Sequence, residues 1–198
     1  MPWESSNAVA SPRGKGYNFS VDNIAETKLR LLFAREEIAR TVDRLASEIS
    51  RDYLDKAPLL IGVLTGSFIF LADLARHLDF PLEIDFVGLS SYGRGTESMG
   101  KVKMERALHT SITGRDVLVV EDIVDTGLTT SYLLDYLRRK KPASLKLCAL
   151  ADKPSRRQIP VTIDYLGFTV PDEFLVGYGL DCDQKFRNLP DISYFEEV

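Results

Sequence analysis

Short apolar runs alternate with longer stretches of helical periodicity along most of the chain. The run LLIGVL, residues 59–64, is continuously apolar and ends at Thr-Gly-Ser, which is typical of a strand buried on both faces. Within residues 34–54, apolar side chains recur at steps of four, three and four, which predicts a helix with one buried face. Further strands are predicted at residues 82–89, 117–120, 145–150 and 161–166, and further helices at residues 68–78 and 129–140. Because strands and helices alternate, the pattern predicts an α/β fold with a mainly parallel, twisted sheet flanked by helices.

Three stretches depart from this pattern. Residues 1–20 are rich in Ser, Gly, Asn and Pro, a composition that buries too little apolar surface to order itself, so we predict a flexible tail. Residues 90–104 are polar, glycine-bearing and too long for a simple hairpin, which favours a mobile functional loop. Residues 170–198 carry several glycines and prolines and predict short strands and turns, as in a small hood. We therefore expect a single domain over residues 21–198.

Composition narrows the classes of function. A net charge of -4 argues against nonspecific binding to nucleic acid or to an anionic membrane surface. Cys148 and Cys182 have no Cys/His cluster around them at the spacing of a zinc site, which favours a reducing cytoplasm. The first residues lack the apolar core of a secretory signal, and no apolar run approaches the roughly 18 residues of a membrane span. We therefore expect a cytoplasmic protein that is neither exported nor inserted into a membrane.

The stretch VLVVEDIVDTGLTT, residues 117–130, carries the most chemical information. In open α/β sheets ligands bind beyond the carboxyl ends of the strands, so Glu121 and Asp122 would stand at the mouth of a site and accept hydrogen bonds from ribose hydroxyls. Next come Asp125 and a glycine among threonines, leading into a helix whose first N–H groups lack intrahelical partners. Because Gly127 lets an anion approach the backbone closely, the turn predicts a cradle for one monophosphate.

Other interpretations of this stretch are open. Any one of these acids or threonines, taken alone, would favour a helix cap, whereas the ordered set favours a phosphate site. A Walker loop is excluded because the G-x-x-x-x-G-K-[ST] spacing and its lysine are missing. A phosphoacceptor receiver domain also opens with a strand such as VLVVED, but more than a hundred residues precede it here and DTGLTT would stay unexplained.

The same stretch resembles the phosphoribosyl-pyrophosphate signature of the type I phosphoribosyltransferases. Around it, four segments follow in the order of the hypoxanthine branch of that family: VLTGSFIFLADL, SSYGRGTESMGKVKM, ADKPSRR and VPDEFLVGYGLDCDQKFRNLPDI. The resemblance covers residues 38–192. It implies the type I phosphoribosyltransferase fold and, in purine salvage, transfer of a phosphoribosyl group to N9 of hypoxanthine and of guanine. It also implies Mg²⁺ as cofactor and a homodimer or homotetramer.

The resemblance also assigns roles to individual residues. Asp125 is implied to act as general acid or base near N7 of the purine. Lys153 is implied to bind the exocyclic oxygen at C6 and so to favour a 6-oxopurine over adenine, because an ammonium has donors only. The implied ligand sets are Glu121 and Asp122 for ribose and magnesium, with Asp181 as a further magnesium ligand; Asp125, Thr126, Gly127, Leu128 and Thr129 for the 5′-phosphate; Thr65, Gly66, Ser91, Tyr92 and Arg187 for pyrophosphate; and Lys153, Phe174 and Leu175 for the purine.

Two positions depart from the family pattern. Thr65 stands where relatives commonly have lysine, so a positive side chain near the pyrophosphate is missing. The loop of residues 64–67 can contain a non-proline cis peptide in relatives, which exposes backbone donors. Leu128 also stands where lysine is frequent, although its backbone N–H can still bind phosphate.

Two alternatives to a hypoxanthine enzyme remain. A non-catalytic regulator that senses phosphoribosyl pyrophosphate could use the same fold. The chain retains Asp125, Lys153 and the pair Ser91–Tyr92, carries no DNA-binding appendage and is acidic, which favours an enzyme. A xanthine-preferring transferase is also open, because the C2 edge of the base is read mostly by backbone groups.

Overall fold

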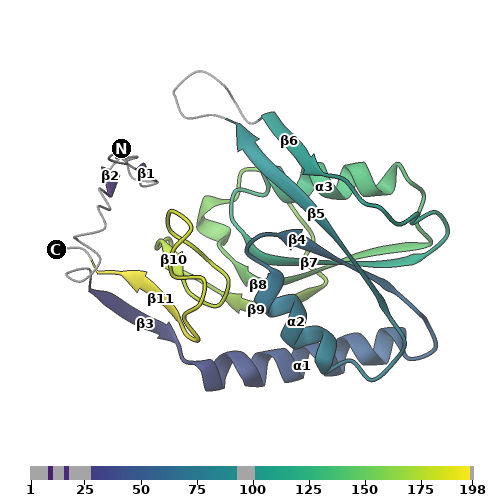
Figure 1. The fold of residues 1–198 in the computed structure, drawn as a ribbon, viewed down its shortest axis with the longest axis horizontal. Helices are drawn as coiled ribbons and strands as arrows, with labels where there is room; N and C mark the ends of the chain where they lie inside the picture. The colour runs from purple at the N-terminus through teal and green to yellow at the C-terminus, as the bar shows by residue number, and fades with distance from the viewer. Residues whose placement is uncertain (1–8, 11–15, 18–27, 93–100, 197–198) are drawn as a thin grey trace, which may run out of the picture. The chain divides into compact units, whose positions relative to one another are not determined.

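The computed structural model describes residues 9–10, 16–17, 28–92 and 101–196, with the backbone alone at residues 9–10, 16–17, 91–92 and 101. The chain divides into a larger unit, residues 36–172, and a smaller unit, residues 1–35 and 173–198. The elements drawn in Figure 1 are, in chain order, β1 Val9–Ala10, β2 Gly16–Tyr17, β3 Leu29–Phe33, α1 Arg35–Tyr53, β4 Leu59–Leu64, α2 Phe68–Arg76, β5 Glu83–Tyr92, β6 Lys101–Arg106, β7 Asp116–Val124, α3 Leu128–Arg138, β8 Ser144–Asp152, the 3₁₀ helix η2 Pro154–Arg156, β9 Tyr165–Thr169, β10 Leu175–Val176 and β11 Ile192–Phe195.

The larger unit is built on a sheet whose described strands follow the order β6-β5-β4-β7-β8-β9. The neighbouring strands from β5 to β9 run parallel, and β6 pairs antiparallel with β5. This arrangement confirms the predicted mainly parallel sheet. Because parallel strands end at the same edge, the carboxyl ends of β4, β7 and β8 meet where ligands bind in such folds.

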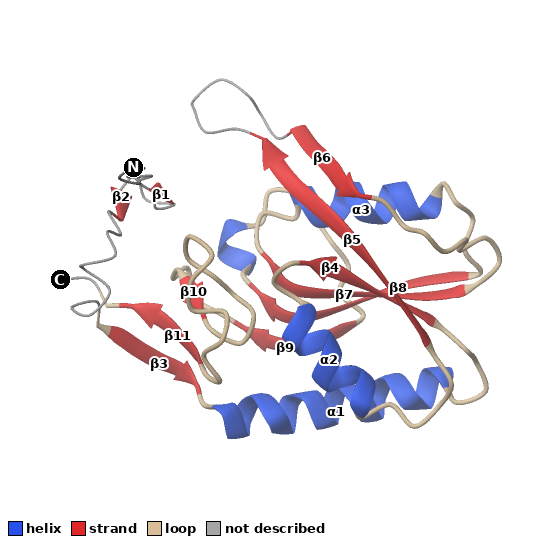
Figure 2. Cartoon of the chain, viewed as in Figure 1, coloured by secondary structure: helices blue, strands red, loops and turns tan. Residues whose placement is uncertain are grey.

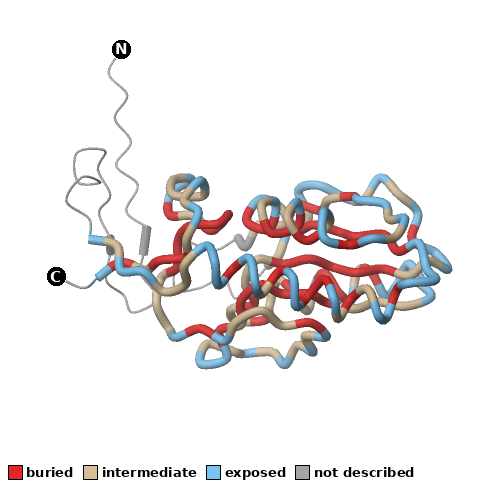
Figure 3. The backbone as a smooth tube through the Cα atoms, turned by 90° about the horizontal axis from the view of Figure 1, so that it is seen from below, coloured by how far each residue is buried: buried red, intermediate tan, exposed pale blue. Residues whose placement is uncertain are grey.

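Helices cover both faces of this sheet. Alternate residues of β4 from Leu59 to Val63 join a buried cluster that α3 completes with Leu133. On the opposite face, α2 packs so closely that a Cβ on Gly62 would lie 2.6 Å from Cδ2 of Leu71. Helix α1 lies beside α2. Nε2 of His77, the C-cap residue of α2, is 3.1 Å from Oδ1 of Asp43 in α1. Figure 3 shows that burial follows the central strands, whose apolar runs produced the strand predictions.

One predicted strand was displaced. The apolar stretch of residues 161–166 predicted a strand, but β9 runs from Tyr165 to Thr169. Val161 and Ile163 instead pack against the buried cluster from a loop, so their hydrophobicity indicated burial and not strand structure.

The predicted loop of residues 90–104 was too long. Strand β5 continues to Tyr92 and β6 begins at Lys101, with Ser90 paired to Lys103. The sequence KVKMER alternates charged with apolar residues, and this two-residue period belongs to a strand with one covered face. Residues 93–100 lie outside the described part of the chain.

The smaller unit contains an antiparallel sheet of order β10-β11-β3. Figure 2 shows β3 and β11 side by side, with β3 leading into α1. Its third strand, β3, had not been predicted, because LRLLF mixes exposed and half-buried positions without a clear period. Two-residue strands β1 and β2 pair within the predicted tail, whose other residues up to 20 lie outside the description. Among helices of the described residues, none is long and apolar enough to span a membrane.

Candidate active site

Glu121 and Asp122 lie at the carboxyl end of β7, as the sequence predicted. Glu121 is buried, and this burial together with the neighbouring negative charge of Asp122 raises the pKa of the Glu121 carboxyl well above its usual range. The Asp122 carboxylate accepts a hydrogen bond of 2.9 Å from the N–H of Ile123. The two acids therefore form a coupled pair that is destabilised whenever both are ionised, a situation that a cation or ribose hydroxyls would relieve.

The loop after β4 lies against this acid pair. The Leu64–Thr65 peptide bond is cis, in agreement with the expectation for this loop. A Cβ added to Gly66 would lie 1.6 Å from Oδ2 of Asp122, so the carboxylate occupies the space that any larger residue would need. Thr65 is exposed, whereas Ser67 is buried and donates from Oγ to the carbonyl of Val63 at 2.7 Å. The backbone of this loop and the Asp122 carboxylate therefore lie next to each other, where one ligand could contact both.

The phosphate loop joins β7 to α3. Gly127 is the N-cap of α3 and has a φ of 83°, in the left-handed region that favours glycine. No side chain of the described residues caps the helix there, and Thr126 Oγ1 accepts only a long bond of 3.4 Å from the N–H of Leu128. The N–H groups of the first turn are thus available in the arrangement that binds anions at helix N-termini.

A neighbouring segment, residues 153–159, clasps this loop. The N–H of Lys153 donates to the carbonyl of Val124 at 3.0 Å, and the N–H groups of Gln158 and Ile159 donate to the carbonyl of Thr126 at 2.9 and 3.1 Å. A Cβ on Gly127 would lie 2.4 Å from the carbonyl oxygen of Ile159. We call this segment the clasp. It fixes the backbone on both sides of residue 125.

Charged side chains of the clasp lie around Asp125. Arg156 Nε is 3.3 Å from Oδ1 of Asp125 and 3.9 Å from Oδ1 of Asp172. Arg157 pairs with Asp152 and also donates to the carbonyl of Val124 at 3.2 Å. Lys153 is 5% exposed, so it is a buried lysine beside the strand end and not a solvated surface residue.

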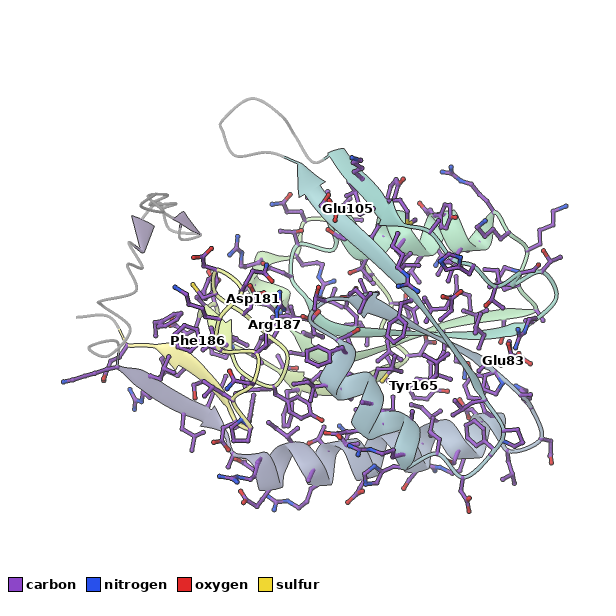
Figure 4. All side chains as sticks on the ribbon, in the orientation of Figure 1. Glu83, Glu105, Tyr165, Asp181, Phe186 and Arg187 are labelled. Carbon is purple, nitrogen blue, oxygen red and sulfur yellow. The ribbon has the colours of Figure 1, made fainter. Side chains whose placement is uncertain are left out.

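The other candidate residues belong to the smaller unit. Arg187 and Asp181 form an ion pair of 2.8 Å, and Arg187 also donates to the carbonyl of Gly179 at 2.8 Å. Figure 4 shows Asp181 and Arg187 on the turns of the C-terminal segment. Phe174 packs on Phe195 with ring centroids 6.0 Å apart, next to the buried Leu175 of β10. Phe174 thus has a core contact, and its role at the purine stays a prediction.

The larger unit therefore brings together most of the predicted set: Gly66, Glu121, Asp122, Asp125, the phosphate loop and Lys153. Ser91 and Tyr92 end strand β5, and their side chains lie outside the description. Sequence reasoning assigned no role to Arg156 and Arg157, although two arginines three and four residues after a candidate base-binding lysine were a usable signal.

The likeness to known proteins covers most of the chain. Residues 31–183 match the phosphoribosyl transferase domain family. The chain belongs to this family. This phosphoribosyltransferase is 49% identical over 164 residues to the hypoxanthine-guanine phosphoribosyltransferase of Bacillus subtilis (strain 168), a match that covers 83% of the chain and 91% of that relative. It is 44% identical over 168 residues to the hypoxanthine-guanine phosphoribosyltransferase of Streptococcus thermophilus (strain CNRZ 1066), covering 85% of the chain and 93% of that relative.

The fold of this phosphoribosyltransferase has a close match among solved structures. The crystal structure of a hypoxanthine-guanine phosphoribosyltransferase from Bacillus anthracis superposes with a TM-score of 0.80 at 47% identity, covering 84% of this chain and 99% of that chain. Together with the mainly parallel sheet, these findings confirm the predicted fold class and the family resemblance.

Proposed function

We propose that this chain transfers the 5-phosphoribosyl group of phosphoribosyl pyrophosphate to N9 of hypoxanthine and of guanine, releasing pyrophosphate. One observation carries the proposal: the clasp binds the backbone on both sides of Asp125, so a candidate proton acceptor, a phosphate loop and a buried lysine share one edge of the sheet. The named relatives favour this enzyme over a regulator that only senses phosphoribosyl pyrophosphate.

The chemistry follows from what each group can do. The bond between C1′ and the pyrophosphate oxygen breaks, N9 forms the new bond to C1′, and the proton on N7 passes to the Asp125 carboxylate. Lys153 donates to the oxygen at C6, which selects 6-oxopurines because adenine presents donors there. The first turn of α3 holds the 5′-phosphate, and Glu121 and Asp122 bind the ribose hydroxyls. Positioning and charge stabilisation therefore supply most of the catalysis.

The donor set fits Mg²⁺ as the cofactor. The described residues hold no group of three or more His, Cys, Asp or Glu side chains suited to a metal. Mg²⁺ is commonly bound by one or two carboxylates together with water and substrate phosphate oxygens, so the coupled pair Glu121 and Asp122 suffices with Asp181 as a further candidate. When bound, the ion would neutralise the pyrophosphate leaving group. A chelator should therefore abolish transfer, and added Mg²⁺ should restore it.

The test is a base-by-base assay. Purified protein with phosphoribosyl pyrophosphate and Mg²⁺ receives hypoxanthine, guanine, xanthine or adenine, and nucleotide and pyrophosphate are quantified. Nucleotide should form with hypoxanthine and guanine, and adenine should be inert. Asp125→Asn should lower the rate about 10²–10⁴-fold, the usual range for general acid–base groups. Asp135→Asn, the same change at an exposed ion pair of α3, should leave the rate unchanged.

The remaining alternatives give different results in the same assay. Nucleotide formation mainly from xanthine would identify a xanthine-preferring enzyme. Binding of phosphoribosyl pyrophosphate without turnover of any base would support the sensor. We also propose a homodimer or homotetramer, which light scattering of the purified protein distinguishes from a monomer.

A further inference from the structure

Asp125 is held by backbone on both sides but has an unusual side-chain environment. The clasp bonds to the carbonyls of Val124 and Thr126, the residues immediately before and after it. Its Oδ1 atom is fully buried, and no described residue donates a hydrogen bond to it. A buried carboxylate oxygen without a hydrogen bond is costly unless a charge lies close by.

Arg156 supplies that charge. Its Nε lies 3.3 Å from the buried Oδ1, and its side chain is about one quarter exposed, at 24%. The position of Arg156 is itself fixed, because η2 begins directly after Lys153 and the N–H of Arg156 donates to the carbonyl of Lys153 at 3.2 Å. The same guanidinium is 3.9 Å from Asp172. Arg156 therefore sits between two carboxylates, nearer to Asp125.

The neighbouring Arg157 makes its contacts with other groups than Asp125. Arg157 forms an ion pair with Asp152 and donates to the carbonyl of Val124, so its charge is neutralised at the strand end. The ion pairs that the described residues form beside Asp125 are thus Arg156 with Asp125 and Asp172, and Arg157 with Asp152, and the buried Lys153 belongs to the same clasp.

We propose that Arg156 is a positioning residue for Asp125. Its guanidinium holds the buried carboxylate oxygen in place, which leaves the other oxygen to accept the purine proton. This inference rests on the proposed function, in which Asp125 is the proton acceptor. Arg156 thus acts through Asp125.

A double-mutant cycle tests this role directly. In the wild-type background, Arg156→Gln should lower kcat for hypoxanthine about tenfold, within the range found for interacting neighbours, while KM for phosphoribosyl pyrophosphate changes less than about twofold. In the Asp125→Asn background the same change should lower kcat less than about twofold, because the carboxylate it positions is gone. Arg156→Lys, which keeps a positive charge, should recover most of the lost rate.

The controls separate positioning from structure and from the proposed function. Arg138→Gln, the same change at an exposed ion pair of α3, should not alter kcat. An equal loss of kcat in both backgrounds, a loss confined to KM, or a lysine variant as slow as the glutamine variant would overturn the inference and assign Arg156 a structural role. A wild-type protein that forms no nucleotide from any base would instead overturn the proposed function, and this inference with it.

Discussion

The phosphate loop of the larger unit and residues 177–187 of the smaller unit, called the turn segment below, hold their candidate residues by different means. In the loop, the N–H groups at the start of α3 carry the predicted function, and the clasp fixes them through backbone hydrogen bonds. In the turn segment, function is predicted for the side chains of Asp181 and Arg187, which bind one another. A change of side chain should therefore be tolerated at Leu128 but not at Arg187.

The two regions also differ in where they place unusual backbone. In the phosphate loop the positive φ falls on Gly127, which adopts it without strain. In the turn segment Tyr178, Asp183, Gln184 and Phe186 have φ between 50° and 73°. Such residues cost of order 1–3 kcal/mol each and persist only where surrounding contacts hold them. The backbone of the phosphate loop is thus unstrained, and larger residues at Gly127 are excluded by lack of space. The backbone of the turn segment is strained, and its conformation depends on side-chain contacts.

Among the changes that test this comparison, Gly127→Ala should have the largest effect. Alanine at this φ costs about 1–2 kcal/mol, and its Cβ would also lie 2.4 Å from the carbonyl oxygen of Ile159. We expect kcat/KM for phosphoribosyl pyrophosphate to fall at least about 10²-fold, as when a donor to a critical anion is lost, together with a lower Tm. Gly114→Ala is the matched control, because its φ is 71° and its Cβ would meet no described atom within 4 Å. It should lower Tm without changing the rate. Equal activities of the two variants would show that the clasp does not shape the loop.

Gly66→Ala should have the next largest effect and a different signature. Its Cβ would displace the Asp122 carboxylate, a side-chain end that can move, so we expect about 10²-fold lower kcat/KM with little loss of Tm. Gly62→Ala, in the preceding strand, would meet Leu71 at 2.6 Å and Phe86 at 2.9 Å. That control should lower Tm and leave activity intact. Similar Tm losses in both variants would mean that Gly66 is needed for folding and not for the site.

Arg187→Gln tests whether the function of the turn segment depends on its side chains. It removes the partner of Asp181 and the donor to the carbonyl of Gly179, so we expect KM for phosphoribosyl pyrophosphate to rise about tenfold. Arg187→Lys should recover only part of this loss, because an ammonium lacks the planar fork of a guanidinium. Arg76→Gln, at an exposed ion pair of α2, is the control and should behave as wild type. Full recovery by lysine would show that charge alone matters here.

Sequence reasoning predicted the helices and strands whose apolar pattern lies within the element itself. Strand β4 and the helix of residues 34–54 were predicted almost to their ends, because burial on both faces or on one helical face leaves a clear signal. Strand β8 was predicted within two residues of each end, whereas the prediction for β7 stopped at residue 120 and the strand continues through the acidic residues to Val124. β9 was displaced because Val161 and Ile163 are buried from a loop, which hydrophobicity cannot distinguish from a strand. Strand β5 was cut short and β6 was missed, because the polar residues there were taken as a loop and are stabilised as strands by pairing with each other.

In the candidate site, too, sequence reasoning found what is local in the chain and missed contacts between distant residues. Glu121, Asp122 and the phosphate loop are contiguous in the chain, so the sequence by itself groups them into one site. The contact of Gly66 with Asp122 and the ion pair of Arg156 with Asp125 join residues far apart in the chain, and only the fold brings them together. The resemblance supplied roles for Lys153 and Asp181 that the residues alone would not have supported.

Leu128→Lys should have the smallest effect and therefore tests the comparison most finely. If the loop binds phosphate through backbone N–H groups, an added ammonium supplies long-range charge alone, and KM for phosphoribosyl pyrophosphate should fall about two- to fivefold at low salt. The gain should disappear at high ionic strength, and the helix should lose a few tenths of a kcal/mol because a cation is unfavourable at its N-terminus. Tyr132→Lys places the same charge one turn further along α3, at a residue that is 42% exposed, and should change KM less. A gain at Leu128 that survives high salt would mean that this lysine binds the phosphate directly, and the loop would then depend on side chains as the turn segment does.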